Sequence, residues 1–493
     1  MATAPTLVAL PQGVKEKLIT QIYTDPGLPK QNPTVPAWQR PTHELSHAQS
    51  PQLAKTADFV IIGSGITGLG VAKTLLENSG EDKKVVVLEA RTLLDGATSR
   101  NAGFLISSSA AVYADMRDAY GEEEARRFVE FCKKNLAGMH SLIDESPQDI
   151  QRACERRQVR CVSSFADESA LAQRTAKLKR YEDAFPDDKG RYSIVSKADA
   201  EKAYDLKGVA GAVSVEGYVC WPYRLLTSVW KELKERYSAR LSIETKTPVS
   251  CVINSPETQA EYPYIVSTAR GIIRTKHVFH CTNALASHLV PQVRGKIYPH
   301  RLVMSTLRRG PQVPNEGNKL CWIFYRNRRL EGSNGSYDVG MSWMQQNAAT
   351  GMLYYGGGAQ KMDDMITSDD SKVPTEPENN LAAALPAHFR DRWDGIKVAE
   401  KEHTWSGIIG RTPDGMPLVG AVGSSANGQN GEWIAAGFNG YGMSLSLLSG
   451  EAIARMALGE GVPDWLPETF HSTPERMSNV ARMGPDAAVR ALL

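Results

Sequence analysis

The sequence has few of the features that mark secreted, membrane-spanning or metal-binding proteins. Its seven cysteines are odd in number, widely spaced and never arranged as C-x-x-C, which predicts reduced thiols rather than a disulfide framework or a zinc site. No basic start is followed by an apolar run, and no stretch approaches the ~18 apolar residues of a membrane span. We therefore expect a cytoplasmic protein with no metal site and no membrane partner.

A strong net charge is also missing. The 57 basic and 55 acidic residues leave a net charge of +2, which is too near neutral to favour a nucleic-acid partner. A G-x-S-x-G motif, which would predict a hydrolase nucleophile, is absent. What remains is a chain of 493 residues, long enough for two to four domains at roughly 100–200 residues each.

The first part of the chain divides into an arm and a nucleotide-binding pattern. Residues 1–55 are rich in proline, and we read them as an extended arm over the first domain, with a disordered tail as the alternative. An apolar run over 59–62 that ends in glycines then predicts a buried parallel strand. A helix over 66–78 and a second strand over 84–88 complete a predicted βαβ unit.

Farther along, predicted helices and strands alternate. Charged, helical periodicity predicts helices, and short apolar or aromatic runs predict strands. The predicted helices span 122–145, 167–185, 225–237 and 443–458. The predicted strands span 159–165, 249–253, 264–267, 277–281, 301–308, 320–326, 338–344, 352–356, 403–409 and 432–437. The acidic, polar stretch 363–380 is expected to be an exposed loop.

The strongest motif is Gly63-Ser64-Gly65-Ile66-Thr67-Gly68, placed between the predicted strand and the predicted helix. In a dinucleotide fingerprint the first glycine allows a tight turn, the second lets the backbone approach a diphosphate, and the third lets the helix pack closely on the strand. Glu89 ends the second strand 21 residues after Gly68, where an acid accepts hydrogen bonds from ribose hydroxyls and disfavours a 2′-phosphate. The motif therefore predicts dinucleotide binding, and by itself it does not distinguish FAD from NAD.

Five stretches, in order over about residues 56–460, resemble the D-amino-acid-oxidase-like superfamily of FAD oxidoreductases, which includes glycine, sarcosine and γ-glutamylputrescine oxidases. They are the fingerprint with Glu89-Ala90, the loop Gly96 to Phe104, Gly217-Tyr218-Val219 with Pro222-Tyr223-Arg224-Leu225, Cys281-Thr282-Asn283-Ala284, and the pair Arg411 to Pro417 and Ala436 to Met443. The last pair is similar to the family's closing signature around the flavin ring. The N-terminal arm resembles that of fungal members.

The resemblance implies an α/β fold, in which a Rossmann-type FAD-binding domain is interleaved with an α+β substrate domain built on an antiparallel β-sheet. The FAD domain would comprise 56–110, 217–292 and 403–460, and the substrate domain 111–216 and 293–402, with the arm at 1–55 and a C-terminal tail at 461–493. The expected cofactor-binding residues are Gly63, Gly65, Ile66, Thr67, Gly68, Glu89, Ala90, Arg91, Thr98, Ser99, Arg100, Asn101, Ala102, Gly103, Val249, Thr282, Asn283, Ala284, Arg411, Gly437, Asn439, Gly440, Tyr441, Gly442 and Met443.

Three positions depart from relatives of this kind. Gly407 stands where several relatives attach FAD to a cysteine, and no histidine lies in 96–105, so we infer non-covalent FAD. Sarcosine-oxidase-like members have a lysine near this point that helps oxygen react, and the stretch 351–356 has none. Molecular oxygen is therefore one candidate among others for the electron acceptor. Ser444 replaces a basic residue that holds a substrate carboxylate, which weakens the expectation of a simple α-amino acid.

The flavin does the difficult chemistry in such enzymes, and the protein orients the substrate. For an amine that chemistry is hydride transfer from the carbon bearing nitrogen to flavin N5. Aromatic side chains suit a neutral amine held over the ring, and Tyr441, Tyr355 and Trp343 are the expected catalytic residues, with Trp322 and Tyr354 as further candidates. The alternative for each of these except Tyr441, which lies inside the glycine loop, is a core residue of the sheet. Arg100 is expected to face the flavin or a phosphate, and its alternative is a surface salt bridge.

Three function classes remain open at this stage. The first is an FAD-dependent amine oxidase or dehydrogenase acting on a small amine or amino-acid-like molecule. The second is a flavin oxidase or dehydrogenase acting on a non-amine intermediate of a biosynthetic pathway. The third is a flavin-binding scaffold without catalysis.

Overall fold

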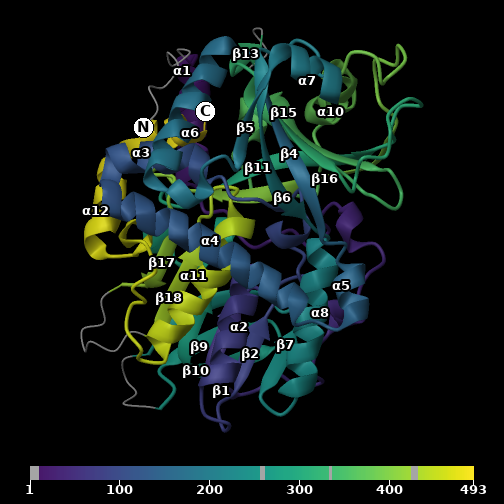
Figure 1. Ribbon diagram of the computed structural model, residues 1–493. Helices are drawn as coiled ribbons and strands as arrows, with labels where there is room; N and C mark the ends of the chain where they lie inside the picture. The colour runs from purple at the N-terminus through teal and green to yellow at the C-terminus, as the bar shows by residue number, and fades with distance from the viewer. Residues whose placement is uncertain (1–9, 256–260, 332–335, 424–430, 493) are drawn as a thin grey trace.

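The computed structural model describes residues 10–255, 261–331, 336–423 and 431–492. They fold around two large sheets, which occupy the lower and upper parts of Figure 1. Sheet A runs in the order β17-β18-β10-β1-β2-β7, with β9 paired to β10 and β8 paired to β9. Its strands are β1 Thr56–Ile62, β2 Val85–Leu88, β7 Leu241–Glu244, β8 Val249–Asn254, β9 Tyr264–Thr268, β10 Gly271–His280, β17 Leu418–Ala421 and β18 Glu432–Ala436.

The centre of sheet A is parallel, because β7, β2, β1, β10 and β18 all run the same way. Strand β2 is buried at every position, and β1 at every position after Thr56, as expected for parallel strands covered on both faces. Helices α2 Ile66–Asn78, α11 Gly442–Ala457 and α4 Glu122–Asp144 form one covering layer, in which α11 packs between the other two. The predicted βαβ unit is therefore present, with the bounds of its helix as expected.

Close packing in this layer depends on glycine. A methyl group at Gly70 of α2 would overlap the carbonyl oxygen of Leu447, and one at Gly450 of α11 would overlap that of Thr67. The two helices therefore approach backbone to backbone. This contact holds the start of α2 and the start of α11 at the same edge of sheet A.

Sheet B runs in the order β16-β11-β15-β14-β12-β4-β6-β3, with β13 beside β14 and β5 beside β6. It is antiparallel except for β4 and β12, which pair in parallel. Its strands are β3 Phe104–Leu105, β4 Arg157–Phe165, β5 Tyr192–Ser196, β6 Gly211–Val219, β11 Tyr298–Leu307, β12 Leu320–Tyr325, β13 Arg329–Glu331, β14 Ser336–Gln346, β15 Leu353–Lys361 and β16 Lys401–Arg411.

Two of the expected domain limits need correction. Strand β16, which covers 401–411, pairs with β11 from Tyr298 to Leu307 and so belongs to sheet B, although 403–411 was expected in the FAD domain. Strand β6 continues to Val219 in sheet B beside β4, although 217–219 was also expected in the FAD domain. In both cases a strand of sheet B is followed directly by a segment that packs with sheet A.

The remaining helices cover the edges and outer faces of the sheets. Helix α10 lies across β15 and β11 of sheet B, and α3 packs with α6 and α4. Their bounds are α1 Gln12–Tyr23, α3 Ser109–Tyr120, α5 Gln148–Ala153, α6 Glu168–Ala184, α7 Lys197–Tyr204, α8 Pro222–Arg236, α9 Ala286–Leu289, α10 Thr375–Ala387, α12 Pro474–Arg482 and α13 Gly484–Leu492. No helix in the described ranges is long and apolar enough to cross a membrane.

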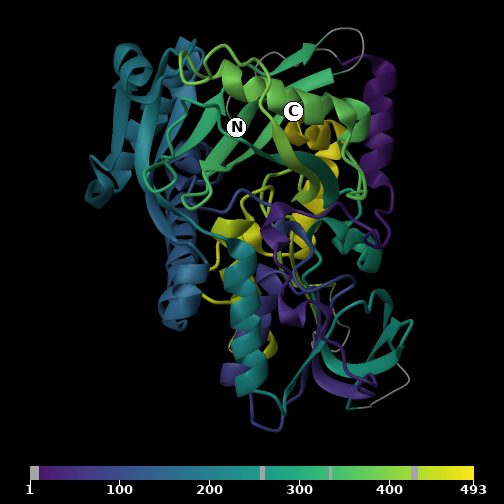
Figure 2. The same ribbon diagram turned by 90° about the vertical axis from the view of Figure 1, so that its right-hand side faces the viewer.

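The N-terminal arm is not simply extended. Helix α1, purple in Figure 2, stands at one edge of the molecule beside the C-terminal helix α13. Leu18 and Ile22 on α1 form a small core with Tyr298 and Tyr337 of sheet B and with Val489 of α13, so the arm contacts sheet B. An apolar face repeating every three to four residues explains the helix.

The stretch 363–380 is also corrected. It was expected to be an exposed loop, but Asp370 is buried and α10 begins at Thr375. Asp370 is buried because two arginines from a distant loop bind its carboxylate, as described below.

Candidate active site

A cavity of about 820 Å³ lies where the carboxyl ends of three central strands of sheet A face sheet B. Its floor is formed by residues that follow β1 (Gly63 to Thr67), β2 (Glu89 to Arg91) and β10 (Cys281 to Asn283). This is the edge at which open α/β sheets bind ligands. The opposite wall comes from sheet B and includes Met304, Ile323 and Trp343.

The glycine turn after β1 is shaped for close approach to a ligand. Gly63 has φ +105°, and a Cβ there would lie 2.8 Å from the carbonyl oxygen of Cys281. Gly65 is the N-cap of α2 and offers no side chain to cap it, while Thr98 Oγ1 accepts from the Ile66 backbone N–H at 3.2 Å. A helix start on a glycine, without an N-cap side chain, fits an anionic group such as a diphosphate.

Glu89 is largely satisfied by the protein. Its Oε2 accepts from the Ser64 backbone N–H at 3.2 Å and from Ser64 Oγ at 2.7 Å, and its Oε1 accepts from the Arg91 N–H at 3.0 Å. A carboxylate offers about four acceptor positions, and these three bonds leave about one of them unused. The side chain is therefore held in place before any ligand binds.

Arg91 and Arg100 line the cavity, but their guanidinium groups bind buried carboxylates. Arg91 Nη1 lies 2.8 Å from Asp370 Oδ2, and Arg100 Nη2 lies 2.7 Å from Asp95 Oδ1. Arg100 also donates to the Ser406 carbonyl at 2.9 Å and is only 3% exposed. The salt bridge of Arg100 is therefore buried, whereas the alternative placed it on the surface. The guanidinium group connects the loop that carries Arg100 to β16.

The closing segment connects β18 to α11. Asn283 Oδ1 accepts from the Gly437 N–H at 2.9 Å, and Asn439 Oδ1 accepts from the Thr412 N–H at 2.9 Å. These bonds tie the segment to the ends of β10 and β16. Tyr441, which is 45% exposed, lines the cavity at the start of α11, where no side chain caps the helix.

Arg411 is the cation nearest to this segment. Its Nη1 donates to the Asn439 carbonyl at 3.1 Å, and its Nε donates to His300 Nδ1 at 3.1 Å. In the described part of the chain no carboxylate forms an ion pair with Arg411. Burial lowers the pKa of Arg411 and holds the pKa of His300 well below its usual range, so His300 is a neutral acceptor and the arginine carries the charge.

Two of the three expected catalytic residues reach the cavity. Trp343 and Tyr441 line it, whereas Tyr355 does not. Tyr355 lies on the opposite face of sheet B with Met344, its cross-strand partner, and its hydroxyl hydrogen-bonds to Ser342 Oγ at 2.9 Å. Neighbouring residues of a strand point to opposite faces, and this pleat sends Tyr355 toward α10.

The two further aromatic candidates also belong to the protein's packing. Trp322 lies in the same apolar cluster as Tyr355, and Tyr354 stacks on Trp38 of the arm with ring centroids 4.0 Å apart. Both side chains therefore belong to the packing of the sheet, which was the alternative considered from the sequence.

Most of the expected cofactor residues line this one cavity. Those that do are Gly63, Gly65, Ile66, Thr67, Glu89, Ala90, Arg91, Thr98, Arg100, Asn101, Ala102, Gly103, Val249, Thr282, Asn283, Arg411, Asn439, Gly440, Tyr441, Gly442 and Met443. Gly68, Ser99, Ala284 and Gly437 lie behind the lining. Gly68 lies behind the lining because it allows α2 to pack closely on the turn after β1. A methyl group at Gly68 would overlap the Gly63 carbonyl oxygen.

Sequence reasoning missed several lining residues. They include Gly27, Leu28 and Pro29 from the arm, His288 from α9, and the aromatic and basic residues Tyr325, Arg326 and Arg174. An Asp-x-Gly turn at 25–27 is the one local signal in the arm, because Asp25 Oδ1 accepts from the Gly27 N–H at 2.8 Å. The others come from strands and helices whose contacts are long-range.

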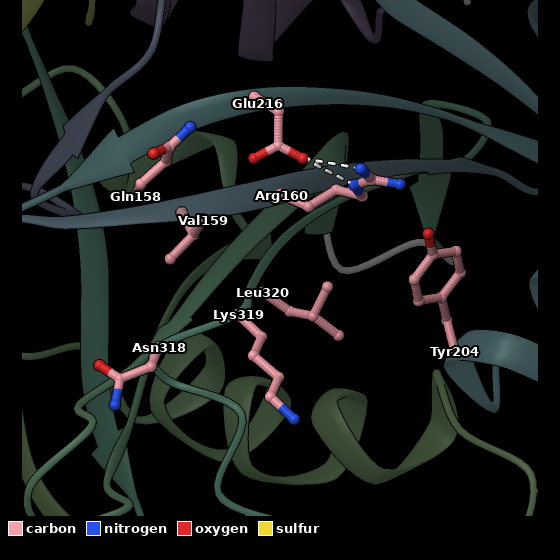
Figure 3. Close-up of a pocket in the computed structure, with 8 residues that line it drawn as sticks. All are labelled: Gln158, Val159, Arg160, Tyr204, Glu216, Asn318, Lys319 and Leu320. Carbon is pink, nitrogen blue, oxygen red and sulfur yellow. Dashed lines mark hydrogen bonds and ion pairs between the residues drawn. The ribbon is translucent and has the colours of Figure 1, made fainter.

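A second depression, of about 470 Å³, lies on the outer side of sheet B and is drawn in Figure 3. Its wall carries Arg160, whose Nε and Nη2 lie 2.9 and 2.8 Å from Glu216 Oε1. Cys161 and Val215, the next residues along these strands, line the larger cavity instead. The sheet thus separates the two hollows, and the larger one holds the residues expected from the motifs.

One motif was overlooked when no metal site was expected. His43-Glu44-Leu45-Ser46-His47 has H-E-x-x-H spacing, which binds zinc when both histidines face one side of an α-helix. Here the segment is a four-residue 3₁₀ helix, His43 Nδ1 accepts from the Leu45 N–H at 3.2 Å, and Glu44 binds Lys231. Among the described residues no three His, Cys, Asp or Glu side chains gather to hold a metal.

The cavity fits an extended dinucleotide with a flavin ring. It runs from the glycine turn and Glu89 to the closing segment, with an uncapped helix start at each place. Thr282 Oγ1, on the wall between them, is buried and has no hydrogen-bond partner in the protein. A buried hydroxyl without a partner is costly unless a ligand supplies one.

Comparison with known proteins agrees with this geometry. The family model described as "FAD dependent oxidoreductase" matches residues 58–456. The γ-glutamylputrescine oxidoreductase of Escherichia coli (strain K12) is 23% identical over 416 residues, covering 82% of this chain and 84% of the relative. Glycine oxidase from Geobacillus kaustophilus superposes with a TM-score of 0.62 at 19% identity, covering 85% of this chain and 99% of that one.

L-proline dehydrogenase from P. horikoshii has the same fold, with a TM-score of 0.61 at 20% identity over 87% of this chain and 99% of that one. The family match covers the glycine turn, Glu89, Arg411 and the closing segment. The chain belongs to the FAD-dependent oxidoreductase family and is an FAD enzyme.

Proposed function

We propose that the enzyme oxidises a C–N bond of a small amine or amino-acid-like molecule that carries an anionic group. The observation that carries this proposal is Arg411, a partly buried cation beside the closing segment with no carboxylate partner among the described residues. Glu89 and Asp115 are the only carboxylates on the described lining, and they are held by Ser64 and Lys177 respectively. The charge of Arg411 is therefore available to a substrate.

The cofactor is assigned to the same cavity. Gly63 to Thr67 would hold the diphosphate at the start of α2, Glu89 would accept from a ribose hydroxyl, and the closing segment would face the flavin ring. When bound, the flavin would supply the two-electron acceptor for the hydride that leaves the carbon bearing the substrate nitrogen. The resulting imine then takes up water and releases the nitrogen as ammonia or an amine.

The chain's own residues orient the substrate for this step. Arg411 binds its anionic group through charge-assisted hydrogen bonds, and Trp343, Tyr325 and Tyr441 provide an aromatic wall. An aromatic wall excludes water and favours the neutral amine, whose lone pair assists loss of the hydride. No carboxylate on this part of the described lining would hold the amine as an ammonium ion.

Anaerobic mixing with a panel of amines and amino acids tests the proposal, with loss of the flavin's visible absorbance as the readout. We expect at least one carboxylate-bearing amine to reduce the flavin, and Arg411→Met to raise its dissociation constant about 10–100-fold, the loss of one charge-assisted hydrogen bond. If no amine reduces a flavin that light can reduce, the non-amine alternative replaces this proposal. Admitting air to the reduced enzyme then shows whether oxygen is the acceptor.

A further inference from the structure

Part of the N-terminal arm lies at the cavity. Gly27, Leu28 and Pro29 line the same cavity as Glu89 and Arg91. We call residues 25–34, which include these three, the nucleotide strap.

The strap is held at its first end by Asp25. The carboxylate accepts from Arg294 Nη2 at 2.9 Å and lies 3.0 Å from His288 Nδ1. His288 also lines the cavity, so this end of the strap is bound to the cavity wall itself. On the other side, Ser368 Oγ donates to the Pro26 carbonyl at 2.6 Å, which ties the strap to the segment before α10.

The second end is held by Thr34. Its backbone N–H and its hydroxyl donate to the Asp370 carbonyl at 2.8 and 2.9 Å, and its own carbonyl accepts from Arg100 at 2.8 Å. The carboxylate of Asp370 binds Arg91, which lines the cavity. Both ends are therefore bonded to a residue that lines the cavity or to one that binds a lining residue.

Core packing does not explain the strap. It contains three prolines and Gly27, whose φ is +68°, and its largest apolar side chain, Leu28, is 39% exposed. The arm is already anchored elsewhere, because α1 packs its apolar face on α13. A stiff segment that buries little and is fixed at both ends serves as a wall.

We propose that the nucleotide strap is part of the FAD site, closing its adenosine end and slowing the release of FAD. The proposal rests on the placement of FAD in this cavity. It assigns to a proline-rich arm outside the family match a direct role in retaining the cofactor.

The test measures the rate at which FAD leaves the full-length holoenzyme, followed by the fluorescence of free FAD after dilution. Asp25→Lys places a cation beside His288 and Arg294, and we expect release about three- to tenfold faster, as for loss of one or two partly exposed ion pairs. Asp25→Asn is a milder variant that keeps the turn to Gly27, and it should accelerate release less. Lys17→Ala is the matched control, because Lys17 on α1 pairs with Asp363 at 2.7 Å at similar exposure.

Faster release in both Asp25 variants and unchanged release in Lys17→Ala support the strap. Unchanged release in the Asp25 variants, or equal acceleration in Lys17→Ala, overturns it. The rate of FAD release from Glu89→Ala distinguishes a wrong role for the strap from a wrong placement of FAD. If Glu89→Ala releases FAD faster while the Asp25 variants do not, the FAD placement stands and the strap role is wrong.

Discussion

Substitution of Glu89 should weaken FAD binding, and the size of the effect can be estimated from the hydrogen bonds that its carboxylate accepts. Glu89 is 9% exposed, and its carboxylate accepts from Ser64 twice and from Arg91 once, at 2.7–3.2 Å. Its remaining acceptor position is the one proposed for a ribose hydroxyl. The substitution therefore removes one bond to the ligand and three bonds that shape the turn beneath it.

Hydrogen bonds to a charged group contribute about 1.5–3 kcal/mol and neutral ones about 0.5–1.5 kcal/mol. Glu89→Gln keeps one carbonyl oxygen but loses the charge, and the difference of about 1 kcal/mol raises the FAD dissociation constant about three- to tenfold. Glu89→Ala loses the whole bond, and the constant should rise about 10–100-fold. It also leaves buried donors without partners, so the apoprotein should lose about 1–3 kcal/mol of stability.

Titration of the apoprotein with FAD, followed by quenching of flavin fluorescence, measures the dissociation constants, and urea unfolding measures the apoprotein stability. Glu77→Gln on α2 is the control, since Glu77 pairs with Lys73 on the surface. The reasoning is refuted if Glu89→Ala binds FAD as tightly as the unmodified protein. Loss of apoprotein stability without loss of affinity would show that Glu89 only supports the turn.

Three further predictions follow from other features. Acid precipitation should release intact FAD into the supernatant, because Gly407 replaces the attaching cysteine; flavin in the pellet would contradict this. Gly450→Ala should lower the melting temperature measured by calorimetry, since the methyl group overlaps the Thr67 carbonyl and overpacking costs about 1–3 kcal/mol, more than the gain in helix propensity. Burial, with Arg326 beside it, lowers the pKa of His388 to about 3, so the folded state binds fewer protons than the unfolded state below pH ~6.5 and stability falls as pH drops from there toward 3. His388→Gln should flatten that loss in urea unfolding at pH 7 and pH 5, and an unchanged slope would mean that other groups cause it.

Elements defined by local pattern were predictable from the sequence. Short-range sterics link the apolar run 59–62, the three glycines and the helix over 66–78, which follow one another in the chain. Helix α2 has the bounds that the pattern predicted. The part Phe438 to Met443 of the closing signature likewise lines the cavity, because its glycines and the helix that follows are contiguous in the chain. For such segments neighbouring residues carry the physical information.

What local pattern could not decide is which distant groups meet. Tyr355 and Trp343 both follow a strand pattern, and only the pairing of β14 with β15 determines that one faces α10 and the other the cavity. Asp370 looked like an exposed acid until the fold placed it against Arg91, 279 residues away. The arm gives no sign of contact with the nucleotide end, because Asp25 and Arg294 are 269 residues apart. The sequence by itself thus determined the nucleotide motif and, through the family resemblance, the FAD cofactor, whereas burial, sheet face and charge pairing depend on long-range packing that only the tertiary structure decides.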